Sequence, residues 1–367
     1  MTLPYLQPVL GWYSANARDL PWRAPAATPW SVLVSEVMLQ QTPVSRVLPA
    51  HRAWLARWPS PAALAADPPA AAVRQWGRLG YPRRALRLHE AARIVTRQHD
   101  GQVPTSRDEL LKLPGIGAYT AAAVAVFAFG RRHAVLDTNV RRVLARLASG
   151  REFPGPQPST AEYRLAESLL PADTAVAARW SVAVMELGAL TCTAARPRCM
   201  ECPLAPQCTW LAAGRPPAKT KRVGQRYEGT DRQCRGRLLA LLRESPEPVW
   251  LKNFDAVWPD DSQRARALDG LVADGLVDPL PNGRFALPAL RPRIRESGGA
   301  YGAPALPAEY RPSRAPGPSP ALRLRQARWR CRRRRPSRPP AAAAPAGLPQ
   351  AKGRGRPRRS AKAVFGG

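Results

Sequence analysis

Apolar residues recur every three or four positions through much of residues 6–190, and proline or glycine separates one run from the next. This spacing is typical of α-helices that bury one face or are buried on all sides. The predicted helices cover residues 6–16, 31–42, 121–129, 140–147 and 177–190. We therefore expect this part of the chain to be largely helical.

The pattern changes toward the C-terminus. Residues 213–230 are basic and contain prolines, which predicts a linker. Short amphipathic runs over 237–243 and 263–275 predict two helices, and residues 276–287 predict a β-hairpin around an Asn-Gly turn. Helices followed by a hairpin are typical of a winged-helix module, which we place at residues 231–290. Such a module either binds DNA or has a purely structural role.

The chain is strongly basic, because 57 Lys and Arg against 26 Asp and Glu give a formal net charge of +31. This excess favours a polyanionic partner, above all nucleic acid. Residues 291–367 carry 20 Lys and Arg but 2 Asp and Glu, which leaves +13 of the charge on residues 1–290. This tail is rich in Arg, Pro and Ala and lacks periodicity, so we expect it to be disordered. It either attracts phosphates without sequence preference or reflects compositional drift.

No run of about 18 apolar residues exists, and the N-terminus lacks the pattern of a signal peptide. We therefore expect no membrane span and a cytoplasmic protein. In a cytoplasmic protein, clustered cysteines are more often metal ligands than disulfides.

A tight turn at Pro114, Gly115 and Gly117 joins two helical patterns. Glycine allows a close approach of the backbone to a ligand, and the turn opens a helix, whose free N–H groups and dipole attract an anion. The turn is therefore a candidate phosphate site. Asp137 lies about 20 residues farther on, directly before another helix, where it is either a functional carboxylate or an ordinary helix N-cap.

Glu36 lies among apolar residues of the helix predicted at 31–42. A carboxyl group in apolar surroundings has a raised pKa, which suits a general acid. The alternative is an ordinary surface glutamate on a partly buried helix. Gln40 lies one turn after Glu36, and Gln40 and Gln41 offer uncharged donors and acceptors that suit base edges.

Four cysteines, Cys192, Cys199, Cys202 and Cys208, are spaced C-x6-C-x2-C-x5-C. Four thiolates within seventeen residues can surround one metal centre, either an iron–sulfur cluster or zinc. Zinc is usually held by two separate C-x2-C pairs, and this segment has one such pair.

The Glu36 helix, the glycine turn, Asp137 and the cysteine loop, in this order, resemble the adenine DNA glycosylases of the MutY type, within the helix-hairpin-helix or endonuclease III superfamily. The resemblance covers about residues 5–212. It implies an all-α fold over residues 1–212, with two helical lobes, a DNA-binding cleft between them and a loop at 192–208 that holds a [4Fe–4S] cluster. The cysteine spacing matches this cluster and disfavours zinc.

The same resemblance assigns roles to the site residues. Glu36 protonates the adenine, and Asp137 stays ionised to stabilise the positive charge that develops on the sugar. Asn139 orients a water molecule or the sugar, although an asparagine in the first turn of a helix also has a local capping explanation. The amides near Gly115 and Gly117 grip a phosphate.

Other positions refine the predicted activity. Gln40, Gln41 and Tyr81 are expected beside the base stack, although Pro82 replaces the second tyrosine that many relatives carry, and a plain surface turn is the alternative for Tyr81. Tyr119 occupies the position at which relatives of the endonuclease III type place a lysine nucleophile. This substitution implies a monofunctional glycosylase.

The resemblance implies a base-excision repair enzyme, a monomer in the nucleoid of a bacterium, that acts on duplex DNA with adenine opposite 8-oxoguanine or guanine. The larger C-terminal domain with which many such enzymes sense 8-oxoguanine is not apparent in the sequence. Two alternatives stay open. One is a bifunctional glycosylase and lyase for oxidised pyrimidines, and the other is an iron–sulfur DNA-binding protein without enzymatic activity.

Overall fold

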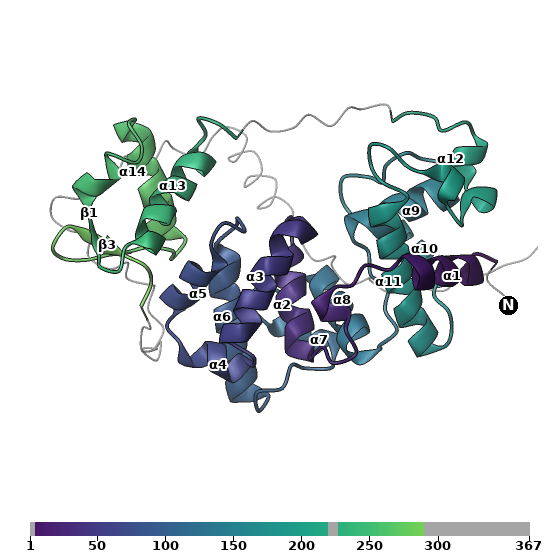
Figure 1. Cartoon of the computed structure of the whole chain (residues 1–367), viewed down its shortest axis with the longest axis horizontal. Helices are drawn as coiled ribbons and strands as arrows, with labels where there is room; N and C mark the ends of the chain where they lie inside the picture. Colours follow the sequence, from purple (N-terminus) through teal and green to yellow (C-terminus); the bar gives the residue numbers. More distant parts are fainter. Residues whose placement is uncertain (1–3, 219–226, 290–367) are drawn as a thin grey trace, which may run out of the picture. The chain divides into compact units, whose positions relative to one another are not determined.

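The computed structural model describes residues 4–218 and 227–289 (Figure 1). The tail predicted at 291–367 and part of the linker predicted at 213–230 lie outside the described residues. No helix in the two described ranges is both long enough and apolar enough to cross a lipid bilayer.

Residues 4–218 are helical, as the apolar spacing predicts. The α-helices are α1 (Leu6–Asn16), α2 (Pro29–Leu39), α3 (Val44–Arg57), α4 (Pro61–Ala66), α5 (Pro69–Trp76), α6 (Arg83–Gln98), α7 (Arg107–Lys112), α8 (Ala118–Phe129), α9 (Thr138–Ser149), α10 (Thr160–Ser168), α11 (Thr174–Leu190) and α12 (Thr209–Ala212). Short 3-10 turns, η1 (Pro21–Arg23), η2 (Cys199–Glu201) and η3 (Ala205–Gln207), connect some of them.

Helix α2 runs through the apolar core, and every residue from Trp30 to Met38 is buried. Its start is fixed by Thr28, whose side chain accepts a hydrogen bond from the Ser31 amide, and by a proline in the first turn. The helix ends at Leu39, so the prediction that it continues to residue 42 was wrong. The chain leaves the helical path at Gln40, whose ψ is 108°, and Gln41 then adopts a left-handed backbone with φ of 56°.

The helices form two groups with separate apolar cores (Figure 1). Helices α2 to α8 share one core, in which Trp54 packs edge-on against Trp58 and Trp76. Helix α1 joins α9, α10 and α11 in the second core, in which Trp180 is almost fully buried. The chain therefore crosses twice between the groups, once before α2 and once after α8.

The C-terminal module of the described chain consists of α13 (Asp231–Glu244), β1 (Val249–Trp250), the 3-10 turn η4 (Leu251–Phe254), α14 (Asp261–Ala273), β2 (Asp278–Pro279) and β3 (Arg284–Ala286). The strands form an antiparallel sheet in the order β1-β3-β2. The predicted hairpin is confirmed as β2 and β3. Both predicted helices are present, but α13 is longer than predicted and α14 begins and ends two residues earlier than predicted. Strand β1 has two residues, too few for a recognisable alternating pattern.

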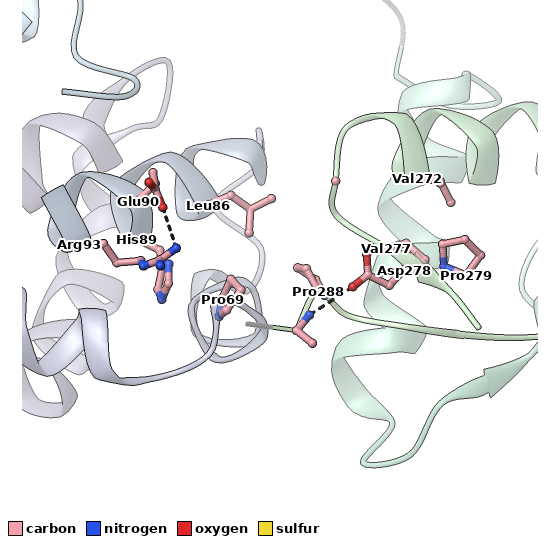
Figure 2. A pocket seen from close by; sticks show the side chains of 12 residues that line it. Pro69, Leu86, His89, Glu90, Arg93, Val272, Val277, Asp278, Pro279 and Pro288 are labelled. Carbon is pink, nitrogen blue, oxygen red and sulfur yellow. Dashed lines mark hydrogen bonds and ion pairs between the residues drawn. The ribbon is translucent and has the colours of Figure 1, made fainter. Parts of the chain in front are cut away.

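A cavity of about 340 Å³ lies between α6 and the C-terminal module (Figure 2). On the α6 side Arg93 forms an ion pair with Glu90, and on the module side Asp278 accepts a hydrogen bond from the Ala289 amide. None of the candidate site residues lines this cavity. The candidate chemistry lies elsewhere.

Candidate active site

Glu36 is a buried carboxyl group, with 4% of its surface exposed. It lies in the middle of α2, where the apolar neighbours predicted from the sequence do surround it. Burial raises its pKa to about 7, and a hydrogen bond with Tyr119 and the charge of Arg23 limit that rise. Its Oε2 atom is buried and has no hydrogen-bond partner among the described residues. The alternative of an ordinary surface glutamate is therefore wrong.

Tyr119, in the first turn of α8, lies next to the Glu36 carboxyl group. Burial and the negative charges of Glu36 and Asp137 raise the pKa of Tyr119 well above its usual range, so it stays a neutral hydrogen-bond donor. The negative charge of Asp137 also raises the pKa of Glu36. The fold thus brings together three site residues that come from α2, α8 and the start of α9.

Asp137 is the N-cap of α9, and its Oδ1 accepts a hydrogen bond from the Val140 amide at 2.6 Å. Its Oδ2 accepts a second bond from the Asn139 side-chain amide at 2.8 Å. Burial raises the pKa of Asp137, whereas these bonds and the nearby Arg142 lower it. The Asp137 carboxylate therefore caps α9 and at the same time lies close enough to Glu36 to affect its pKa.

Asn139 uses both ends of its amide within the protein. It donates to Asp137, and its Oδ1 accepts from Arg142 at 2.9 Å. Gly188 on α11 allows this arrangement, because a Cβ atom at Gly188 would lie 2.7 Å from the Cβ atom of Asn139. In this geometry Asn139 fixes the orientation of the Asp137 carboxylate.

The predicted base-stack residues lie on two loops. The Gln40 side chain donates to the Thr120 hydroxyl at 3.2 Å, next to Tyr119. Gln41 is exposed at the end of α2, and Tyr81 is exposed directly before α6. Both Gln41 and Tyr81 have left-handed backbones, with φ of 56° and 46°. The structure therefore presents these two side chains to solvent on strained backbone.

The glycine turn connects α7 and α8 as the sequence predicts. Gly115 has φ of 82°, and a Cβ atom there would lie 2.9 Å from Arg87. Gly117 has an extended backbone that any residue can adopt, and nothing lies within 4 Å of the place where a Cβ atom would be, so the protein itself does not require a glycine there. The backbone hydrogen bonds in the turn start from the amides of Leu113 and Ile116, and within the described chain the amides of Gly115 and Gly117 have no backbone acceptor.

Comparison with known proteins identifies the family of this chain. The HhH-GPD superfamily of base excision DNA repair proteins matches residues 34–170. The adenine DNA glycosylase of Mycolicibacterium smegmatis is 53% identical over 281 residues, which cover 76% of this chain and 94% of that protein. This chain belongs to the adenine DNA glycosylases.

More distant proteins share the core of this glycosylase. The human adenine DNA glycosylase is 40% identical over 209 residues, which cover 54% of this chain and 38% of the human protein. The solved structure of a thermostable thymine-DNA glycosylase is 27% identical and superimposes with a TM-score of 0.51, covering 57% of this chain and 95% of its own. The helical core is therefore that of the helix-hairpin-helix glycosylases.

The four cysteines of the glycosylase follow α11 and line one small cavity of about 20 Å³, together with Arg146 and Trp210. Arg146, which is almost fully buried, donates to the Cys192 sulfur at 3.2 Å. Four soft thiol donors on one cavity fit an iron–sulfur cluster in their chemistry. In this structure, no three Cys, His, Asp or Glu side chains of residues 4–218 and 227–289 come together as a metal-binding group.

Sequence reasoning missed a buried ion cluster beside the site. Glu186 on α11 accepts hydrogen bonds from Arg18 at 2.7 Å and from Arg23 at 2.9 Å. Burial by itself raises the pKa of Glu186, but the two arginines outweigh it and lower that pKa to about 2. The cluster fixes the segment between α1 and α2, and with it Arg23, whose charge also acts on Glu36 and Tyr119.

Arg142 on α9 was also missed. Its guanidinium donates to the Cys192 carbonyl oxygen at 2.8 Å and to the Gly188 carbonyl oxygen at 2.5 Å, besides Asn139. One side chain therefore connects the Asp137 end of the site to the start of the cysteine loop. The only signal in the sequence was an arginine pair on an otherwise apolar helix face.

Proposed function

We propose that this glycosylase hydrolyses the N-glycosidic bond of adenine mispaired with 8-oxoguanine or guanine in duplex DNA. One observation supports it above the others, namely a buried Glu36 with a pKa of about 7 and an unpartnered Oε2, next to the second carboxyl group of Asp137. Glycoside cleavage uses two carboxyl groups in different protonation states. A single chain supplies both groups and Tyr119, which supports a monomeric enzyme.

Glu36 is the general acid of the proposed reaction. In its protonated form it delivers a proton from the free Oε2 to N7 of the adenine, and the electron pair of the broken bond between C1′ and N9 leaves with the protonated base. Tyr119 orients the other oxygen by hydrogen bonding. Because the pKa of Glu36 is about 7, a large fraction of the enzyme is protonated at neutral pH.

Asp137 stabilises the positive charge that develops on the sugar. Its two hydrogen bonds, from Val140 and Asn139, favour the ionised carboxylate against the opposing effect of burial. The cationic sugar then takes up a water molecule at C1′, and the proton of that water passes to a carboxylate. The products are free adenine and an abasic site.

Reaching the target base requires that it leave the base stack. The unpartnered amides of Gly115 and Gly117 at the start of α8 suit a backbone phosphate. The exposed Gln41 and Tyr81 suit contacts with the bases left in the stack. The net charge of +31 adds general affinity for DNA.

We further propose that Cys192, Cys199, Cys202 and Cys208 hold a [4Fe–4S] cluster. When bound, the cluster supplies a rigid, thiolate-linked loop rather than a reacting group. Arg142 and Arg146 contact Cys192 from α9, and so the loop supports the helix that Asp137 begins. The exposed Arg196 and Arg198 place positive charge on the surface of this loop.

The proposed specificity is tested with single-turnover assays on three labelled duplexes, with adenine opposite 8-oxoguanine, adenine opposite guanine, and thymine glycol. We expect strand cleavage at the two mispaired adenines after alkali treatment and none at thymine glycol. Tyr119 in place of a lysine predicts that borohydride traps no covalent adduct. Alkali-independent cleavage at thymine glycol, or a trapped adduct, would instead establish the bifunctional glycosylase and lyase.

A further inference from the structure

Arg84, in the first turn of α6, is buried although no carboxylate of the described chain forms a salt bridge with it. Six oxygen atoms surround its guanidinium instead. Nη1 donates to the carbonyl oxygens of Val37 at 2.9 Å, Met38 at 2.9 Å and Gln40 at 2.6 Å, and Nη2 donates to the Thr42 hydroxyl at 2.9 Å and the carbonyl oxygens of Gly80 at 3.0 Å and Leu79 at 3.5 Å.

These acceptors belong to two segments that are far apart in sequence. One is the end of α2 with the glutamine loop, residues 40–43, and the other is the tyrosine loop, residues 77–82. The last carbonyl groups of a helix lack partners within the helix, and a cation placed there also complements the helix dipole. Arg84 therefore ends the Glu36 helix and ties the tyrosine loop to it.

The glutamine loop and the tyrosine loop each contain a residue with a left-handed backbone. Arg84 binds the carbonyl groups of Gln40 and Gly80, and the next residues, Gln41 and Tyr81, are the left-handed ones. A left-handed backbone at a residue other than glycine persists when its surroundings hold it in place. Here one guanidinium holds the peptide groups before both of them.

Thr42 reinforces the connection. Its hydroxyl accepts from Arg84 and lies 3.3 Å from the carbonyl oxygens of both Gln40 and Leu79, to which it can donate. The Arg84 guanidinium also lies over the rings of Trp76 and Tyr81, with its carbon 5.1 Å and 5.6 Å from the ring centroids. The tyrosine ring and the backbone beneath it are thus held by the same group.

We propose that Arg84 is a positioning residue, which locks the glutamine loop and the tyrosine loop together so that Gln41 and Tyr81 enter the base stack as one rigid pair and keep the adenine out of it. This inference rests on the proposed function. Lysine cannot replace arginine here, since one ammonium group with three donors cannot reach six acceptors arranged around a planar guanidinium.

The test uses Arg84→Lys, which keeps the charge, and Thr42→Val, which keeps the shape but removes the hydroxyl. The control is Arg83→Met, because the Arg83 side chain is exposed, lies on the same helix turn and forms its ion pair with Asp274. Thermal unfolding identifies variants that remain folded. Single-turnover rate constants at saturating enzyme are then measured on two duplexes, one with adenine opposite 8-oxoguanine and one with adenine opposite an abasic-site analogue.

The second duplex separates base extrusion from chemistry, because an adenine without a pairing partner leaves the stack at lower cost. We expect Arg84→Lys to lower the rate constant about tenfold on the paired adenine and less than about twofold on the unpaired one. Thr42→Val has the same pattern with a smaller effect, and Arg83→Met affects both duplexes equally. With 2-aminopurine as the target base, Arg84→Lys lowers the fluorescence gain that accompanies unstacking.

Equal losses on the two duplexes, or a changed pH midpoint of the rate, would overturn the inference, because Arg84 would then act through Glu36 or through the fold as a whole. If the wild type excises adenine but Arg84→Lys loses activity equally on the two duplexes, the role proposed for Arg84 is wrong and the proposed function stands. A wild-type enzyme that excises no adenine contradicts the proposed function and the inference with it.

Discussion

The Tyr119 hydroxyl donates a hydrogen bond to the Glu36 carboxyl group, and this bond lowers the pKa that burial raises. The bond favours the ionised carboxylate, so its removal favours the protonated form. Tyr119→Phe therefore moves the pKa of Glu36 above 7. Single-turnover excision, which we expect to decline in the wild type as pH rises through about 7, should persist to higher pH in the variant. An unchanged midpoint would show that Glu36 does not set the pH dependence.

The raised pKa of Glu36 also has a cost in stability. In the unfolded chain this carboxyl group ionises near 4.5, whereas in the folded chain it ionises near 7, so the folded state binds more protons between these values. The contribution of Glu36 to the free energy of unfolding therefore falls as pH rises from 4.5 to 7. We expect Glu36→Gln to be more stable than the wild type at pH 8, by on the order of 2 kcal/mol, and this advantage to shrink toward pH 5. Urea unfolding at both pH values measures it.

The contribution of Glu186 to stability has the opposite pH dependence to that of Glu36. Its folded pKa of about 2 lies below the unfolded value of 4.5, so its ion pairs stabilise the protein above 4.5 and are lost as pH falls toward 2. Glu186→Gln leaves the partly buried Arg18 and Arg23 without the buried carboxylate that they share, and we expect a loss of about 3 kcal/mol at pH 7. The control Glu167→Gln, at an exposed pair with Arg132, should cost less than about 1 kcal/mol. Equal costs in chemical unfolding at pH 7 would contradict the burial argument.

Gly188 packs closely against Asn139, so a larger side chain at Gly188 should lower both the stability and the excision rate. A Cβ atom at Gly188 would also lie 2.9 Å from the Asn139 carbonyl oxygen, so Gly188→Ala forces α9 and α11 apart. We expect a loss of about 2 kcal/mol in stability and a slower single-turnover excision, because Asn139 orients Asp137. Gly11→Ala is the matched control, since nothing lies within 4 Å of that position in α1. A helix gains stability from this change, and excision should not respond.

The sequence predicted those features that depend on neighbours along the chain. The limits of α1, the turn with Gly115, the cap at Asp137 and the hairpin formed by β2 and β3 all follow from local spacing, capping and turn chemistry. The apolar neighbours of Glu36 suggested a buried carboxyl group but left a surface glutamate open, and the structure shows that Glu36 is buried. Tyr119 was identified from the resemblance to a family, and the structure places it against Glu36.

Contacts between distant segments were not predictable from one sequence. Arg18 and Glu186 are separated by 168 positions, and Arg84 reaches carbonyl oxygens 44 to 47 positions away. Every residue has a backbone carbonyl group, so the sequence does not show which carbonyl groups an arginine binds. An arginine that binds them cannot be told from a surface arginine. The early end of α2 has the same origin, because Arg84 binds the carbonyl groups at which the helix stops.

In the proposed reaction, Glu36 and Asp137 carry out adenine excision. The most direct measurement is the single-turnover rate of alkali-revealed strand cleavage on a duplex with adenine opposite 8-oxoguanine, for the wild type, Glu36→Gln and Asp137→Asn. The asparagine keeps an oxygen that can cap α9, and the glutamine matches the shape of glutamate, so both variants should fold. We expect each rate constant to fall by at least about 100-fold, with DNA binding retained. Excision by Glu36→Gln at a rate close to that of the wild type would contradict it.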